Sequence, residues 1–144
     1  MSKQEEAGLI LKLYELRREE TMRKARDWYF REFNPQSMAD FTAAIFGEHS
    51  GHLRMVVSYW DMVSSFVTSG VLNQELLFQS GGELLVVWEK IRPLTEGMRK
   101  ISGNPNSWSN IEKVGNAYIK FMGPEAYAGF QAMIARVSSS AVQS

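Results

Sequence analysis

The sequence contains no cysteine, and this absence excludes disulfide bonds, thiolate catalysis and zinc sites built from cysteine. It has only two histidines and no excess of either charge, since 16 lysines and arginines balance 16 aspartates and glutamates. A neutral chain creates no overall field that would concentrate nucleic acid or an anionic membrane surface around it. The composition therefore argues against nucleic acid as a partner and fits a reducing compartment.

Long apolar runs are also missing. Near the start of the chain, Glu5 and Glu6 precede a short apolar run, and dense charge follows it. This order is wrong for a secretory signal peptide, and the run is too short. No stretch approaches the roughly 20 apolar residues that a membrane-spanning helix requires. We therefore expect a cytoplasmic protein without a membrane partner.

The chain does contain enough apolar material for one core. Its 144 residues are 44% hydrophobic and 12% aromatic, and we expect a single domain spanning residues 1–144. Apolar residues recur at helical spacing along most of the chain, and no segment shows the sustained alternation of a half-buried strand. The predicted fold is all-α: a single-domain helical bundle of about six or seven helices, with a long N-terminal helix.

That first helix is predicted over residues 5–33, which contain no proline, and Asn34-Pro35 ends it. Its apolar stripe is interrupted between Leu16 and Met22 by a turn that is polar on all sides. The part before this turn is predicted to project from the body and to find a partner of its own. The candidate self-association residues are Leu9, Ile10, Leu13 and Leu16.

A second segment, residues 53–69, is apolar around most of its circumference, which predicts a helix in the middle of the bundle. Shorter helices are predicted over residues 37–47, 71–79, 83–101, 107–122 and 125–137. Pro93 removes a backbone donor, so the helix that contains it is expected either to kink there or to restart. Residues 138–144 are predicted to be a frayed tail.

Glu48, His49 and His52 lie together in the segment 47–54. Imidazole and carboxylate suit zinc or iron, but two histidines three residues apart on a loop do not align on one helical face, and no other histidine or cysteine completes the site. With Ser50 as the cap of the next helix, the helix dipole disfavours a charged His52. We predict a solvated helix junction in preference to a metal, pH-sensing or catalytic site, and no cofactor.

Asp61 lies in the most apolar predicted helix, beside Tyr59 and Trp60 and two turns after Arg54. A buried carboxylate is costly unless it is paired, so Asp61 needs a partner. One interpretation is structural, with Asp61 as acceptor for an arginine, a tyrosine hydroxyl or the amino terminus of a helix. The other makes it a base with a raised pKa in a pocket. The structural interpretation is favoured.

Trp88 and Arg99 also allow two interpretations. They belong either to an anion or ligand site, or to a core tryptophan beside surface ion pairs that contribute a few tenths of a kcal/mol each. The second is favoured. In the first, both residues would join Trp60 and Asp61 around an interior pocket.

Recognised catalytic and binding motifs are missing as well: no P-loop, dinucleotide fingerprint, nucleophile elbow, zinc-protease helix, EF-hand or zinc finger is present. The basic residues of segment 17–31 alternate with acidic ones that would repel a phosphate backbone. A salt-bridged helix surface explains this alternation better than a nucleic-acid adaptor does.

Three stretches are similar to a known family. They are an Arg-Arg-Glu helix that leads to an aromatic pair (residues 16–30), a Tyr-Trp helix that ends in glycine before a short helix (53–78), and a Trp-Glu helix that runs into proline and arginine (82–99). Over roughly residues 13–110, the chain resembles a family of uncharacterised bacterial all-helical domains of unknown function. The resemblance implies an all-α fold and no particular activity. Some members of that family carry an N-terminal membrane anchor, whereas this sequence predicts none.

These patterns lead to two functional hypotheses. The leading one is a non-enzymatic cytoplasmic interaction module that self-associates as a homodimer through its N-terminal helix. The alternative is a small-molecule-binding or catalytic helical bundle with an interior pocket. The candidate pocket residues are Arg54, Tyr59, Trp60, Asp61, Trp88 and Arg99. The sequence identifies neither a ligand nor a protein partner.

Overall fold

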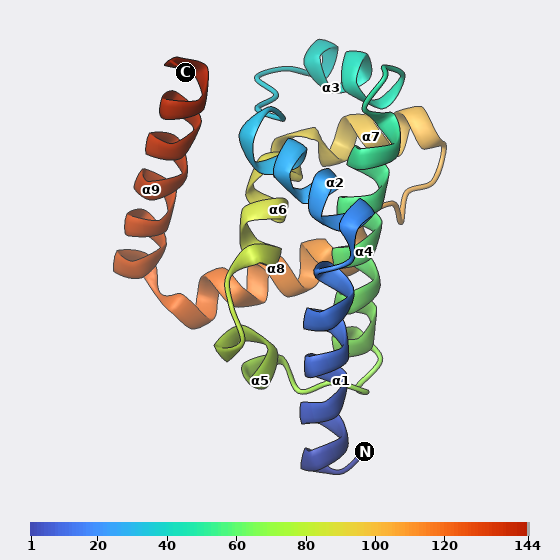
Figure 1. The fold of residues 1–144 in the computed structure, drawn as a ribbon, viewed down its shortest axis with the longest axis vertical. Coiled ribbons are helices and arrows are strands. Elements are labelled where there is room, and N and C mark those ends of the chain that lie inside the picture. The colour runs from blue at the N-terminus through green and yellow to red at the C-terminus, as the bar shows by residue number, and fades with distance from the viewer. Residues whose placement is uncertain (144) are drawn as a thin grey trace.

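The computed structural model describes the backbone of residues 1–143 and the side chains of residues 1–138, and its regular elements are all helices (Figure 1). The elements in chain order are α1 (Lys3–Arg17), α2 (Glu20–Arg31), α3 (Met38–Ile45), α4 (Ser50–Thr68), α5 (Gln74–Gln79), α6 (Glu83–Ile91), the 3₁₀ turn η1 (Arg92–Leu94), α7 (Thr95–Ser102), α8 (Ser109–Met122) and α9 (Pro124–Gln143). The predicted all-α fold is confirmed. The described residues form more helices than the six or seven expected, because two predicted helices are each divided.

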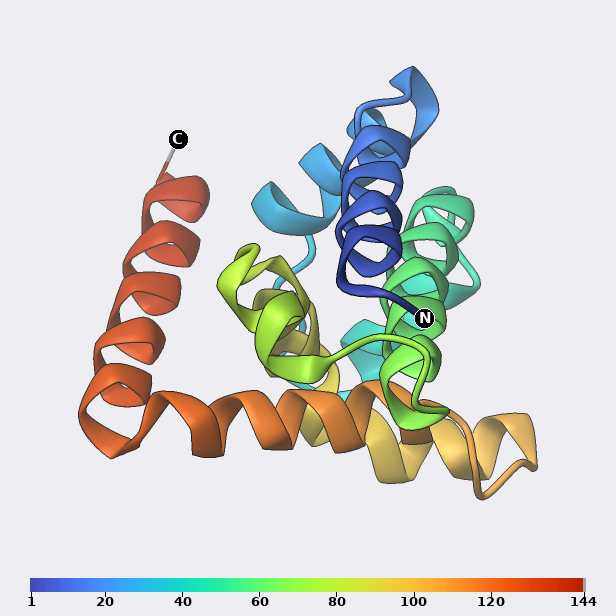
Figure 2. The same cartoon turned by 90° about the horizontal axis from the view of Figure 1, so that it is seen from below.

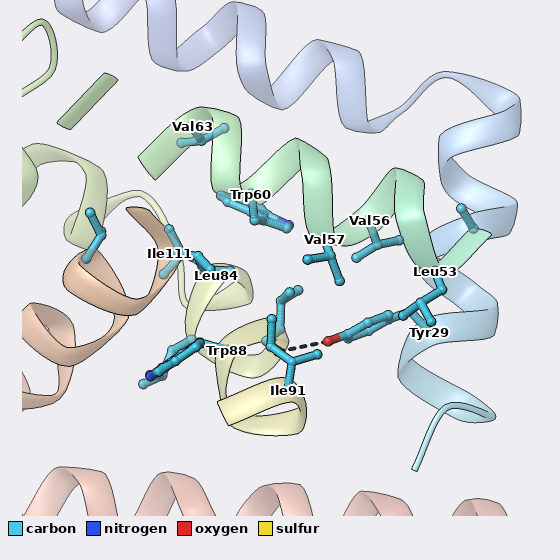
Figure 3. Packing of buried hydrophobic residues seen from close by; sticks show 14 of the residues in the cluster. Tyr29, Leu53, Val56, Val57, Trp60, Val63, Leu84, Trp88, Ile91 and Ile111 are labelled. Carbon is cyan, nitrogen blue, oxygen red and sulfur yellow. Dashed lines mark hydrogen bonds between the residues drawn. The ribbon is translucent and has the colours of Figure 1, made fainter. Parts of the chain in front are cut away.

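The central element is α4, which packs against α2, α3, α6 and α8. Its buried apolar side chains are Leu53, Val56, Val57, Trp60 and Val63. Figure 3 shows them in one core with Tyr29 of α2, Leu84 of α6 and Ile111 of α8. The central position predicted for residues 53–69 is therefore confirmed.

The single helix predicted over residues 5–33 is wrong, because α1 ends at Arg17 and α2 begins at Glu20. Glu19 is the N-cap of α2, and its carboxylate accepts hydrogen bonds from two backbone N–H groups in the first turn of that helix, both 3.0 Å long. These bonds satisfy donors that the start of a helix leaves unpaired. The polar turn seen in the sequence is thus the place where one helix stops and another starts.

The first helix does not project from the body as expected. Leu13 is buried, and Leu9 and Ile10 pack against the core. The hydroxyl of Tyr59 on α4 donates a hydrogen bond to the backbone carbonyl of Leu13. Figures 1 and 2 show α1 lying alongside α4, so this segment is part of the bundle.

Pro93 divides the helix predicted over residues 83–101. α6 ends at Ile91, the 3₁₀ turn η1 follows, and α7 begins at Thr95. Of the two outcomes expected at the proline, a kink or a restart, the restart is observed, because proline cannot donate the backbone hydrogen bond that continues an α-helix.

Helices α6 and α8 approach each other closely at Gly115. A Cβ atom built on this residue would overlap the indole of Trp88. Trp88 is fully buried, and its indole N–H donates a 3.2 Å hydrogen bond to Oδ1 of Asn116. The absent side chain at Gly115 therefore provides the space that the indole fills.

The last helix, α9, stands at the edge of the bundle on the side away from α4 (Figures 1 and 2). Tyr127 donates a hydrogen bond of 2.5 Å to Oε1 of Glu89, and Ser138 donates one of 3.0 Å to Oδ1 of Asn34. The backbone is helical into the segment 138–144, for which the sequence predicts fraying. That prediction stays untested, because the last residue and the side chains after Ser138 lie outside the described residues.

Candidate functional site

Asp61 lies half-buried on α4. Its Oδ1 accepts a 3.0 Å hydrogen bond from the backbone N–H of Ile111, in the first turn of α8. The N-cap position of α8 is Trp108, which forms no side-chain cap. Asp61 supplies the missing acceptor, and its negative charge faces the positive end of the helix dipole. Of the structural partners considered for Asp61, the amino terminus of a helix is the one observed.

Tyr59 and Trp60 have different partners. The hydroxyl of Tyr59 bonds to the carbonyl of Leu13 on α1, and the indole N–H of Trp60 donates to Oε2 of Glu83 at 3.0 Å. Burial raises the pKa of Tyr59 to about 12. The hydroxyl therefore stays protonated at neutral pH and remains a donor.

Glu83, which the sequence analysis did not single out, joins α6 to three other helices. Both of its carboxylate oxygens accept hydrogen bonds from Arg26 of α2, the shortest at 2.6 Å, and Arg17 of α1 lies 3.6 Å from Oε1. Trp60 of α4 is the third partner, and the Glu83 side chain is only 12% exposed. We refer to Arg17, Arg26, Trp60 and Glu83 as the Glu83 junction. Charge-assisted bonds of this kind are among the strongest in proteins.

Lys90, at the other end of α6, was also missed. Its ammonium group donates hydrogen bonds to the carbonyl oxygens of Tyr29, Phe30 and Phe33 at 2.8, 3.2 and 2.9 Å, where α2 ends. It forms no salt bridge with the carboxylates of residues 1–138, and burial lowers its pKa to about 8. Lys90 thus caps the carboxyl end of α2. Its spacing of seven from Glu83, on the same side of an apolar helix, was the available sequence signal.

Trp88 and Arg99 take part in separate structural contacts. The indole of Trp88 lies over Gly115, and Arg99 forms an ion pair with Glu112, Nη2 to Oε1, at 2.9 Å. The four residues predicted to surround one pocket thus have four different partners: Glu83 for Trp60, Ile111 for Asp61, Asn116 for Trp88 and Glu112 for Arg99. No hydrogen bond or ion pair within the described side chains joins any two of the four.

Two cavities each contain two of the candidate pocket residues. Tyr59 and Trp60 line a groove of about 310 Å³ between α1, α4 and α5. Arg54 and Asp61 line a cavity of about 400 Å³ formed by α3, α4, α7 and the residue before α8. The two cavities lie on different sides of α4.

His49 and His52 stack with Trp28 of α2, with their ring centroids 5.1 and 6.1 Å from that of the indole. Helix α4 begins at Ser50, so His49 and not Ser50 occupies the N-cap position, and the predicted cap is wrong. Within the described side chains, no group of three histidine, cysteine or carboxylate residues could hold a metal ion. The segment forms the junction between α3 and α4.

The apolar side chains that α1 exposes most are not the ones predicted to mediate self-association. Three of the four candidate self-association residues contact the chain's own core: Leu9, Ile10 and Leu13. The fourth, Leu16, is 43% exposed. Leu11 and Tyr14 are more exposed, at 68% and 53%, and both form the rim of the groove beside α1. The apolar surface offered by this helix is therefore centred on Leu11 and Tyr14.

The family described as a domain of unknown function (DUF4760) matches residues 4–118. The chain belongs to this family. The predicted resemblance to helical domains of unknown function is thus confirmed, and no activity comes with the family. No curated protein and no solved structure matches the chain.

The DUF4760 match ends within α8, so α9 lies beyond it. The Glu83 junction, the exposed Leu11 and Tyr14 of α1, and the cavity beside Arg54 all fall inside the matched residues. Among the helices that the structure describes, none is long and apolar enough to cross a bilayer.

Proposed function

We propose that this DUF4760 chain is a cytoplasmic, non-enzymatic interaction module that forms a homodimer through the outer face of α1. The observation that carries the proposal is a self-complementary row on that face. Its members are Lys3, Ala7, Leu11 and Glu15, and all four are exposed. Residues four apart lie on one ridge of a helix, so the row reads positive, apolar, apolar, negative.

An antiparallel pair of α1 helices matches this row to itself. With the two-fold axis at the middle of the row, Ala7 of each copy lies opposite Leu11 of the other, and Lys3 lies opposite Glu15. Leu11 is 68% exposed and the neighbouring Tyr14 is 53% exposed, so the pairing removes two large apolar side chains per copy from water. The small side chain of Ala7 allows the two helices to approach closely.

This interface replaces the one predicted from sequence. Leu9, Ile10 and Leu13 are used by the chain's own core. Leu16 is exposed but lies five residues from Leu11, which places it about 140° around the helix and outside the row.

The polar groups of the bundle support binding in preference to catalysis. Asp61 accepts a hydrogen bond from the start of α8, Glu83 is bonded to arginines, and Lys90 caps the end of α2. Each of these ionisable groups already forms a hydrogen bond with another part of the bundle. The lack of cysteine supports a reducing compartment.

The test is sedimentation velocity of the full chain at tens of micromolar. We expect a dimer for the natural sequence and a monomer for Lys3→Glu, because this change places two pairs of negative charges face to face. The double variant Lys3→Glu, Glu15→Lys exchanges the charges within the row, and we expect it to restore the dimer. As a matched control, Lys12→Glu has the same charge change on the same helix, outside the row, and should remain dimeric.

Two results would overturn the proposal. One is a natural chain that is monomeric throughout this concentration range. The other is a dimer that survives Lys3→Glu and Leu11→Asp, because an interface elsewhere on the molecule would then hold the two copies together.

A further inference from the structure

We propose that the cavity beside Arg54 and Asp61 is a second binding site, and that it takes a small organic monocarboxylate with an apolar body. Its volume of about 400 Å³ falls in the range of small-molecule sites. The site does not include the outer face of α1, so it stands or falls separately from the homodimer.

The walls of the cavity are apolar and largely preformed. The apolar lining residues are Phe41, Ile45, Leu53, Val57, Met98 and Trp108. Phe41, Leu53 and Val57 belong to the buried core, so this part of the wall is fixed by the fold. An apolar ligand body placed here leaves water without requiring the bundle to rearrange.

Trp108 forms one wall in a strained backbone conformation. Its φ of 62° and ψ of 19° place it in the left-handed region, the one described residue other than glycine with a positive φ. This costs about 1–2 kcal/mol for a residue with a side chain, and such strain tends to be stored at functional sites. The indole meets the ring of Phe41 edge-on, with centroids 5.6 Å apart. The strained residue therefore completes an aromatic corner of the cavity.

Arg54 supplies the charge that recognises a carboxylate. It lines the cavity and is exposed. Arg26 and Arg99 are each paired with a carboxylate at 2.6 and 2.9 Å, whereas Arg54 forms no ion pair or hydrogen bond with the side chains that the structure describes. A guanidinium group binds a carboxylate through two parallel hydrogen bonds. An unpaired guanidinium beside an apolar wall thus matches a ligand with one anionic end.

Asp61 restricts the ligand to a single negative charge. It lines the same cavity two turns along α4 from Arg54, about 10 Å away along the helix axis. Its carboxylate would repel a second anionic group at that end of a bound molecule. The site therefore selects a monoanion whose other end is neutral.

The probes for the test are 4-phenylbutyrate, its neutral amide 4-phenylbutanamide, and the dianion 4-(4-carboxyphenyl)butanoate, each titrated into the full chain and followed by amide NMR shifts. We expect saturable shifts from 4-phenylbutyrate centred on α3, on the first three turns of α4 and around Trp108. The amide and the dianion should each bind about tenfold more weakly.

Two variants test whether Arg54 recognises the carboxylate of the ligand and whether Asp61 rejects a second negative charge. Arg54→Gln should abolish the preference for the acid over the amide, and Asp61→Asn, which keeps an oxygen acceptor for α8, should abolish the discrimination against the dianion. Arg23→Gln, an exposed arginine on α2, is the matched control and should change neither. The proposal is overturned if shifts at the cavity are absent or do not saturate, if the natural chain binds acid and amide equally, or if a folded Arg54→Gln chain still prefers the acid.

Discussion

The two ends of α6 bury a charge in opposite ways. At the amino end, the carboxylate of Glu83 meets the guanidinium groups of Arg17 and Arg26. At the carboxyl end, the ammonium of Lys90 meets carbonyl oxygens at the end of α2 and no opposite charge within the described side chains. One charge is balanced by ions and the other by backbone dipoles. Removing Glu83 therefore leaves two cations without their carboxylate partner, whereas removing Lys90 leaves only neutral acceptors without a donor.

The largest expected effect is that of Glu83→Gln. The amide can still accept from Trp60, but Arg17 and Arg26 lose the carboxylate that holds them at the junction. We expect the free energy of unfolding to fall by about 2–4 kcal/mol in urea titrations.

The control for this change is Glu20→Gln on α2. Glu20 forms an ion pair with Lys24 at 3.3 Å, but both side chains are mostly exposed, so we expect a change below about 0.5 kcal/mol. If Glu83→Gln were as mild as Glu20→Gln, the junction would be a surface ion pair and the contrast with Lys90 would disappear.

Asp61 is a third charged group to compare with Glu83 and Lys90, and it is a carboxylate that accepts one hydrogen bond from the backbone. Asp61→Ala removes the acceptor for the Ile111 N–H and leaves the start of α8 without a side-chain cap. We expect a loss of about 1–3 kcal/mol in unfolding free energy. Asp61→Asn keeps an oxygen acceptor and should lose less than Asp61→Ala. Equal losses for the two variants would show that the charge, and not the hydrogen bond, is what matters.

The smallest expected effect is a pH dependence caused by Lys90. Its pKa is about 8 in the folded chain against an ordinary 10.5, so between these values the unfolded chain binds more protons. The stability contribution of Lys90 therefore rises as pH increases through this window. Because the group is partly exposed, we expect a gain of no more than about 1 kcal/mol.

The pH dependence of stability caused by Lys90 has to be separated from that caused by the tyrosines. Burial raises the pKa values of Tyr29 and Tyr59 above 10, and a raised tyrosine pKa makes stability fall at higher pH. Urea titrations from pH 7 to about 9.5 avoid most of that opposing effect. Lys90→Met should flatten the rise, and an unchanged slope in this variant would assign the rise to another group.

The parts of the fold that sequence predicted are those determined locally. The apolar circumference of α4 predicted its central place, and Asn34-Pro35 and Pro93 marked the ends of helices because proline acts on its own backbone. The break at Glu19 was missed, because the flanking residues are good helix formers and glutamate is an unusual N-cap.

The candidate site was harder to predict because its bonds join distant parts of the chain. The structural role of Asp61 as a hydrogen-bond acceptor was predicted, since a buried carboxylate needs a partner. The Glu83 junction was not, because Arg26 and Glu83 are 57 residues apart and nothing in local periodicity links them. Exposure on α1 was likewise decided by packing, which turned Leu13 inward and left Leu11 outside.

The fit of Trp88 over Gly115 constrains how the sequence can evolve. Any side chain added at Gly115 would overlap the indole, and a smaller residue at Trp88 alone would open a void in the core. Neither position can change first without a loss of stability, so substitutions here are expected to be coupled, with a smaller residue replacing tryptophan wherever a side chain replaces glycine. In an alignment of DUF4760 sequences, the two positions should therefore vary as a pair.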